Sequence, residues 1–173
     1  ILVLEGAYQA GSFADDDIQA FAASGTLIYK AFTLPWTPHF LISYNYASGD
    51  DDPTDNDRQT FRNLFPTNHL FYGVNDLFSW QNLENLQFRA KFFPNPDFTF
   101  VIDYHYFRLA EANDFHFNAG GVPIRADLSP RNSGRRASQT VGQELDVTFV
   151  YNINRSLSVF AQYGHFFAGP YYR

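Results

Sequence analysis

The stretch from Leu86 to Leu109 holds two segments in which apolar and polar residues alternate, joined by a proline-rich turn. Alternation with a period of two is typical of β-strands, and the short turn predicts a hairpin. One face of the hairpin carries large apolar side chains, Leu86, Phe88, Ala90 and Phe92 followed by Phe98, Phe100, Ile102, Tyr104 and Tyr106, and the other face carries Gln87, Arg89, Lys91, Val101, Asp103 and His105. Such strands suit either a sheet with one wet face or a membrane barrel, with its aromatic face in lipid and its polar face toward an aqueous lumen.

Composition favours the membrane alternative. Aromatic residues make up 19% of the 173 residues, yet the mean hydropathy is −0.30, as two-faced strands require. No apolar run approaches the roughly 18 residues of a transmembrane helix. The chain has no Cys, which excludes disulfides and thiol chemistry, and its net charge of −6 gives no reason to expect a nucleic-acid partner.

Five further alternating segments, near residues 1–13, 18–32, 40–49, 144–151 and 157–164, predict seven strands in all, with an acidic turn at Asp15 to Asp17. Short connections at 33–38, 94–97 and 152–156 alternate with long insertions at about 50–81 and 112–138. An antiparallel up-and-down transmembrane β-barrel places short turns at one rim, periplasmic in bacterial outer-membrane barrels, and long extracellular loops at the other. Aromatic residues also gather near both predicted rims, at Trp36, Phe92, Phe93 and Phe98, and at Tyr104, Tyr106, Phe166 and Phe167.

Seven strands do not close a barrel whose bacterial members have even strand numbers. Open strand edges in a bilayer leave unsatisfied backbone groups that cost several kcal/mol each. We therefore expect residues 1–173 to form one partial barrel domain, with further strands on both sides of it.

The run from Tyr46 to Leu86, which contains FPTNHLFYG and DLFSWQNL, and the later segments DYHYFRLAEA, VGQELDV and YGHFFAG resemble the alginate-export family of outer-membrane barrels. The resemblance covers the chain from about residue 20 onward and corresponds to the C-terminal part of the family domain. It implies a monomeric barrel of roughly 18 strands in the bacterial outer membrane, surrounded by lipid and lipopolysaccharide. It further implies that an anionic exopolysaccharide leaves through a charged lumen by passive diffusion, with periplasmic export components as candidate partners.

The predicted wall carries charges of both signs. The in-phase hairpin register places Arg89 opposite Asp103 and Gln87 opposite His105, and opposite charges across strands stabilise a sheet by roughly 0.2 to 1 kcal/mol. The arginine is either part of a structural ion pair or, with Lys30 and Lys91, part of a cationic track for carboxylated sugars. The acids Glu5, Asp103, Glu144 and Asp146 oppose a purely cationic conduit. The candidate lumen residues are Lys30, Arg89, Lys91, Asp103, His105, Glu144 and Asp146.

Two loop clusters carry alternative interpretations. Asp50, Asp51, Asp52, Asp55 and Asp57 form either a solvated acidic loop or a site for Ca²⁺ or a cation that bridges lipopolysaccharide, although the spacing lacks the EF-hand order. Arg131, Arg135 and Arg136 either attract anionic polymer or solubilise their loop. No other cofactor is expected.

Catalysis has little support. The five His residues fit no zinc-protease or zinc-site spacing, and no nucleophile-elbow motif accompanies Ser133 or Ser138 near the conceivable pair of Asp114 and His116. We therefore expect no enzyme. Three classes of function stay open: an export conduit for anionic polysaccharide, a general or small-solute outer-membrane porin, and a soluble β-sheet binding module.

Overall fold

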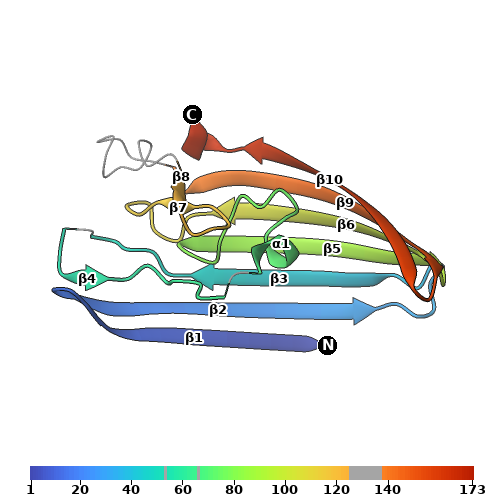
Figure 1. Cartoon of the computed structure of the whole chain (residues 1–173), viewed down its shortest axis with the longest axis horizontal. Coiled ribbons are helices and arrows are strands. Elements are labelled where there is room, and N and C mark those ends of the chain that lie inside the picture. Colours follow the sequence, from blue (N-terminus) through green and yellow to red (C-terminus); the bar gives the residue numbers. More distant parts are fainter. Residues whose placement is uncertain (53, 66, 125–137) are drawn as a thin grey trace.

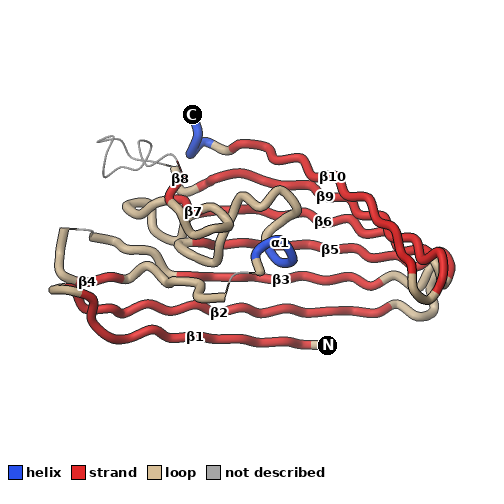
Figure 2. Tube along the Cα trace, viewed as in Figure 1, coloured by secondary structure: helices blue, strands red, loops and turns tan. Residues whose placement is uncertain are grey.

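The computed structural model describes residues 1–52, 54–65, 67–124 and 138–173. Long strands form one antiparallel sheet in which each strand pairs with its neighbours in chain order (Figures 1 and 2). They are β1 (Leu2–Phe13), β2 (Asp16–Lys30), β3 (His39–Ala47), β5 (Leu83–Asn95), β6 (Phe98–Arg108), β9 (Thr140–Asn154) and β10 (Leu157–Ala168). These strands confirm the predicted all-β, antiparallel, up-and-down architecture. No helix in the described ranges is long and apolar enough to cross a membrane.

The connections from β2 onward separate by length as the sequence predicts, whereas the two-residue turn between β1 and β2 lies at the end of the long loops. The turns that join β2 to β3, β5 to β6 and β9 to β10 lie at one end of the sheet, and the long loops lie at the other (Figure 1). The long loops contain short elements: β4 (Asp57–Arg58), α1 (Asn68–Phe71), β7 (His116–Phe117), β8 (Pro123–Ile124) and, after β10, a 3₁₀ turn η2 (Pro170–Tyr172). β4 pairs in parallel with the start of β2.

Two local details differ from the prediction. Asp16 and Asp17 belong to β2, so the turn after β1 consists of Ala14 and Asp15, with Ala14 in the left-handed region at φ 57°. This conformation suits a tight hairpin turn. Phe93 follows the strand alternation onto the face of Lys91, where its ring centroid lies 4.8 Å from that of His39, so it does not belong to the outer aromatic girdle predicted to contain it with Phe92.

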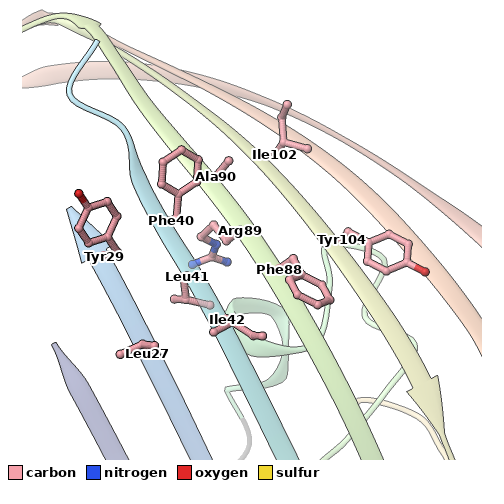
Figure 3. Close-up of a pocket in the computed structure, with 10 residues that line it drawn as sticks. All are labelled: Leu27, Tyr29, Phe40, Leu41, Ile42, Phe88, Arg89, Ala90, Ile102 and Tyr104. Carbon is pink, nitrogen blue, oxygen red and sulfur yellow. The ribbon is translucent and has the colours of Figure 1, made fainter. Parts of the chain in front are cut away.

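The sheet has two unlike faces. Its aromatic face is open: Phe88 and Phe149 are 45% and 44% exposed. Figure 3 shows part of this face, where Phe40, Phe88, Ala90 and Tyr104 are among the residues that line an apolar depression of about 420 Å³. The opposite face, here called the covered face, carries Asp103, which is only 6% exposed. In a water-soluble sheet the apolar face is buried and the charged face is exposed. Here the apolar side chains are exposed and the charged side chains are covered by other segments of the chain.

The hydrophobic core lies between the covered face and the long loops. Phe78 from the loop before β5 stacks on Phe107 of β6, with ring centroids 3.7 Å apart. Around them pack Phe61, Tyr72, Trp80, Leu83, Leu109, Val141 and Tyr171. Phe166 also packs against this core, so it does not belong to the outer aromatic girdle predicted for it. The loop end of the covered face is therefore filled by protein.

Candidate functional site

Uncharged polar side chains form a hydrogen-bonded ladder across the covered face. The hydroxyls of Thr26 and Ser43 lie 2.7 Å apart, and Ser24 Oγ donates to Asn45 Oδ1 at 2.8 Å. Asn45 Nδ2 donates in turn to Asn85 Oδ1 on the next strand at 3.2 Å. Because each group has a partner, polar side chains can line this half-buried wall without a large desolvation penalty.

The predicted hairpin register is confirmed, and it forms the expected ion pair. Arg89 lies opposite Asp103, and Arg89 Nε donates to Asp103 Oδ1 at 2.6 Å. Gln87 Nε2 donates to the same carboxylate oxygen at 2.7 Å. His105 lies opposite Gln87, as predicted, but the hydrogen-bond partner of its Nδ1 is Asn85 at 3.3 Å.

A row of basic side chains crosses three strands toward the short-turn end. Lys30 of β2 lies opposite His39 of β3, which lies opposite Lys91 of β5. Arg89 occupies the neighbouring position on the same face of β5. In the described part of the chain neither Lys30 nor Lys91 forms an ion pair, although Lys91 Nζ lies 5.1 Å from the ring centre of Phe93. The register would have placed His39 in this row, but sequence reasoning missed it.

Glu144 and Asp146 do not stand on an open wall. They are 0% and 2% exposed, because the segment after α1 lies over them. The backbone N–H of Asn75 donates to Glu144 Oε1 at 3.1 Å, and that of Val74 donates to Asp146 Oδ2 at 3.2 Å. The long loop between β3 and β5 thus folds onto the face that carries the predicted lumen charges.

A cleft of about 380 Å³ remains between this loop and the wall. Basic, acidic and neutral polar groups of the sheet line one side, and residues of the loop around α1 line the other. The wall contributes Arg89, Lys91, Val101, Asp103, His105, Asp146, Thr148 and Gln162, and the loop contributes Thr67, His69, Leu70, Gly73 and Val74. Such a cleft offers charge and hydrogen bonds to a passing polar solute.

In the acidic loop, the carboxylates of Asp52 and Asp55 accept hydrogen bonds from residues of the same loop. Asp52 Oδ1 accepts hydrogen bonds from the backbone N–H and the hydroxyl of Thr54, at 3.0 and 2.6 Å, and Asp55 Oδ1 accepts one from the N–H of Asp57 at 2.8 Å. Across the described ranges, which omit residue 53, no three His, Asp or Glu side chains come together as a metal site. Ca²⁺ at Asp50, Asp51, Asp52, Asp55 and Asp57 stays a prediction. The arginines at 131, 135 and 136 lie outside the described residues.

The conceivable acid–base pair does not form. Both ring nitrogens of His116 are engaged, Nε2 with the carbonyl oxygen of Leu77 at 3.0 Å and Nδ1 with the hydroxyl of Tyr172 at 2.7 Å. A carbonyl can only accept, so Nε2 donates and Nδ1 accepts from Tyr172. Burial lowers the pKa of His116 to about 4. The histidine thus serves to join three segments, and Ser133 lies outside the described residues.

One ion pair on the aromatic face was missed from sequence. Arg108 Nη1 donates to Glu84 Oε2 at 3.1 Å, and Arg108 Nη2 donates to Gln139 Oε1 at 2.8 Å, close to the long loops. The register that pairs Arg89 with Asp103 also pairs Glu84 with Arg108. The signal was therefore available in the sequence.

An up-and-down antiparallel sheet with an exposed aromatic face and a polar, loop-lined opposite face defines the wall of a membrane-channel barrel. A family model described as "Alginate export" matches residues 2–173, and the chain belongs to this alginate-export family. The match confirms the resemblance and extends it across nearly all of the chain. No curated protein sequence matches the chain. The family places the chain broadly among membrane polysaccharide-export channels, a transport class and not an enzyme class.

Proposed function

We propose that this chain forms part of the wall of a bacterial outer-membrane channel through which an anionic exopolysaccharide leaves the cell by passive diffusion. The observation that carries the proposal is the pair of lysines, Lys30 and Lys91, that flank His39 across three strands, with Arg89 beside Lys91, on the face that borders the cleft. Rings and rows of fixed charge select ions of opposite sign in pores. Carboxylated sugars are the matching cargo.

The acidic side chains on this face lower the positive potential of the basic row less than their number suggests, because Asp103, Glu144 and Asp146 each have partners of their own. Asp103 is compensated by Arg89 at 2.6 Å and by Gln87 at 2.7 Å. Glu144 and Asp146 lie beneath the loop and accept its backbone N–H groups. Lys30 and Lys91 have no such compensation among the described residues. The field at the cleft is therefore more positive than the count of charged residues would give.

The aromatic face supports outer-membrane lipid as the surrounding partner. Its exposed side chains include Leu27, Phe40, Ile42, Phe88, Leu145 and Phe149. The pair of Arg108 and Glu84 marks where this apolar surface ends near the long loops, at the level where lipopolysaccharide headgroups would begin. The opposite rim, formed by short turns, would face the periplasm and any export components there.

A small-solute porin on the same framework is the second candidate. Neutral hydrogen-bonding side chains, Thr148 and Gln162, line the same cleft as Arg89 and Lys91. These groups suit uncharged sugars as well as anions. The two candidates differ in selectivity, which a measurement can separate.

The test is reconstitution of the complete protein in a planar bilayer. We expect anion selectivity in a KCl gradient and block of the current by soluble polyuronate. Lys91→Glu should lower the anion-to-cation permeability ratio by about twofold, because one uncompensated positive charge becomes negative. Arg155→Glu is the matched control, since Arg155 lies exposed in the short turn between β9 and β10. Passage of neutral sugars without polyuronate block would favour the porin, and an equal response of both variants would remove Lys91 from selectivity.

A further inference from the structure

Two buried carboxylates on β9 hold a loop that comes from elsewhere in the chain. Glu144 and Asp146 each accept one backbone N–H, from Asn75 and Val74, at 3.1 and 3.2 Å. Hydrogen bonds from backbone N–H groups to a carboxylate are among the stronger ones in proteins. The contact thus fixes the course of the loop backbone without depending on loop side chains.

Glycines on both sides allow this close approach. Gly73 has φ +90°, and a Cβ there would lie 2.3 Å from Glu144 Oε1. On β10, a Cβ at Gly164 would lie 2.5 Å from Val74 Cγ2 and 2.6 Å from Asp146 Oδ1. A larger residue at Gly73 would push the loop away from the wall, and so would one at Gly164 as long as the side chains of Val74 and Asp146 are in place.

Among the described residues, no basic side chain forms an ion pair with either acid. Asp103 and His105 face them from β6, and Arg89, which lines the same cleft as Asp146, is bonded to Asp103. β10 places Gly164 and Phe166 opposite them, and the loop places His69 and Asp76, which bond to each other at 2.9 Å. In the described structure Glu144 Oε2 and Asp146 Oδ1 have no hydrogen-bond partner. The side chains of Glu144 and Asp146 also interact with each other, and the backbone donors to them are the N–H groups of Asn75 and Val74.

We propose that Glu144 and Asp146 are positioning residues that hold residues 73–75 against the wall and thereby set the width of the channel at the cleft. The segment has anchors on both sides, since Tyr72 and Phe78 are buried in the core. The carbonyl of Leu77 is also bonded to His116, and Asp76 to His69. Loss of the carboxylates therefore releases residues 73–75 and leaves the rest of the loop in place. The proposal rests on the proposed function only in requiring that this face line a channel, whatever passes through it.

The experiment measures single-channel conductance of the complete protein in KCl. Glu144→Ala with Asp146→Ala should raise conductance by about twofold, because the freed segment leaves the narrowest part of the pore. Glu144→Gln with Asp146→Asn keeps oxygen acceptors for both N–H groups and should keep conductance near that of the wild type. An equal rise in both pairs of variants, or no rise in the alanine pair, would overturn the proposal.

A cross-link separates loop release from a misfolded barrel. The described chain has no Cys, so Val74→Cys with Gly164→Cys adds a single pair where the two residues meet. In the alanine background, oxidation should return conductance to the wild-type value, and reductant should raise it again. Gly73→Ala, which leaves the wall untouched, should also raise conductance. Failure of the oxidised cross-link to restore conductance would overturn the proposal, whereas a missing polyuronate block would count only against the proposed cargo.

Discussion

Lys91 and Asp103 lie on the same face of neighbouring strands, but their charges have different surroundings. Asp103 receives hydrogen bonds from Arg89 and Gln87 and is almost fully covered. Lys91 packs on Phe93 and has no carboxylate partner among the described residues. A tally of charges on the wall therefore misjudges the field in the cleft. In the proposed channel, the compensated charges would stabilise the wall and the uncompensated ones would face the solute.

His116 gives a pH dependence whose sign follows from its burial. The folded state holds the neutral ring, with a pKa of about 4, whereas the unfolded segment takes up a proton near the ordinary value of 6.5. The contact is therefore at full strength above pH 6.5 and loses stability as pH falls from 6.5 toward 4, by up to about 3 kcal/mol. We expect faster limited proteolysis of the loop that contains β7 as pH is lowered across this window.

Two histidine variants test this dependence. His116→Phe should remove most of the pH dependence of cleavage, while His165→Asn, at an exposed position on β10, should leave it unchanged. The protease must be active across the whole pH window. Its cleavage rate on an unfolded substrate, measured at each pH, distinguishes the effect of pH on the loop from its effect on the protease. Cleavage that stays constant in the wild type between pH 7 and 4.5 would contradict the assigned role of His116.

At the level of elements, the loop between β3 and β5 behaves as part of the fold. Phe78 is 1% exposed and stacks on Phe107. Phe78→Ala should make the packing of this loop against the sheet less favourable by about 3 to 5 kcal/mol, because an apolar ring is no longer buried and a cavity is left behind. The strands should be unaffected, because their ladder does not include this residue. Hydrogen exchange of the folded protein should show faster exchange in residues 67–82 and unchanged exchange in β5 and β6.

Phe65→Ala is the matched control, since Phe65 belongs to the same loop but is 90% exposed. It removes the same side chain without removing a core contact, so we expect exchange rates like those of the wild type. Equal effects of the two substitutions would show that Phe78 does not anchor the loop.

The strands and the loop differ in how far sequence could predict them. Alternation predicted the strands, and the turn length predicted the register of Arg89 with Asp103, because both are local properties. The course of the loop depends on long-range contacts such as Phe78 with Phe107, which periodicity does not encode. The sequence did indicate that this loop packs against the sheet, because the loop contains many aromatic residues. For the same reason the sequence placed Lys91 and Arg89 correctly but left Glu144 on an open wall.

In the molecule as a whole, the two faces of the sheet have opposite environments. The aromatic face carries exposed Phe88 and Phe149, while the covered face carries polar ladders, the basic row and the folded loop. Strands beyond β1 and β10, which would close the barrel, stay a prediction. The orientation of the two faces can be tested without them, because alternate residues of one strand sample both sides.

The most direct measurement is the quenching of a fluorophore attached to single cysteines in the complete protein, reconstituted in lipid vesicles. Phe88→Cys and Phe149→Cys sample the aromatic face, and Lys91→Cys and Thr148→Cys sample the covered face of the same strands, β5 and β9. We predict that quenchers carried on lipid chains act on the first two labels and that a water-soluble quencher acts on the last two. Labels at 88 and 149 that respond to the aqueous quencher alone, with no response to lipid-borne quenchers, would contradict the membrane-channel account.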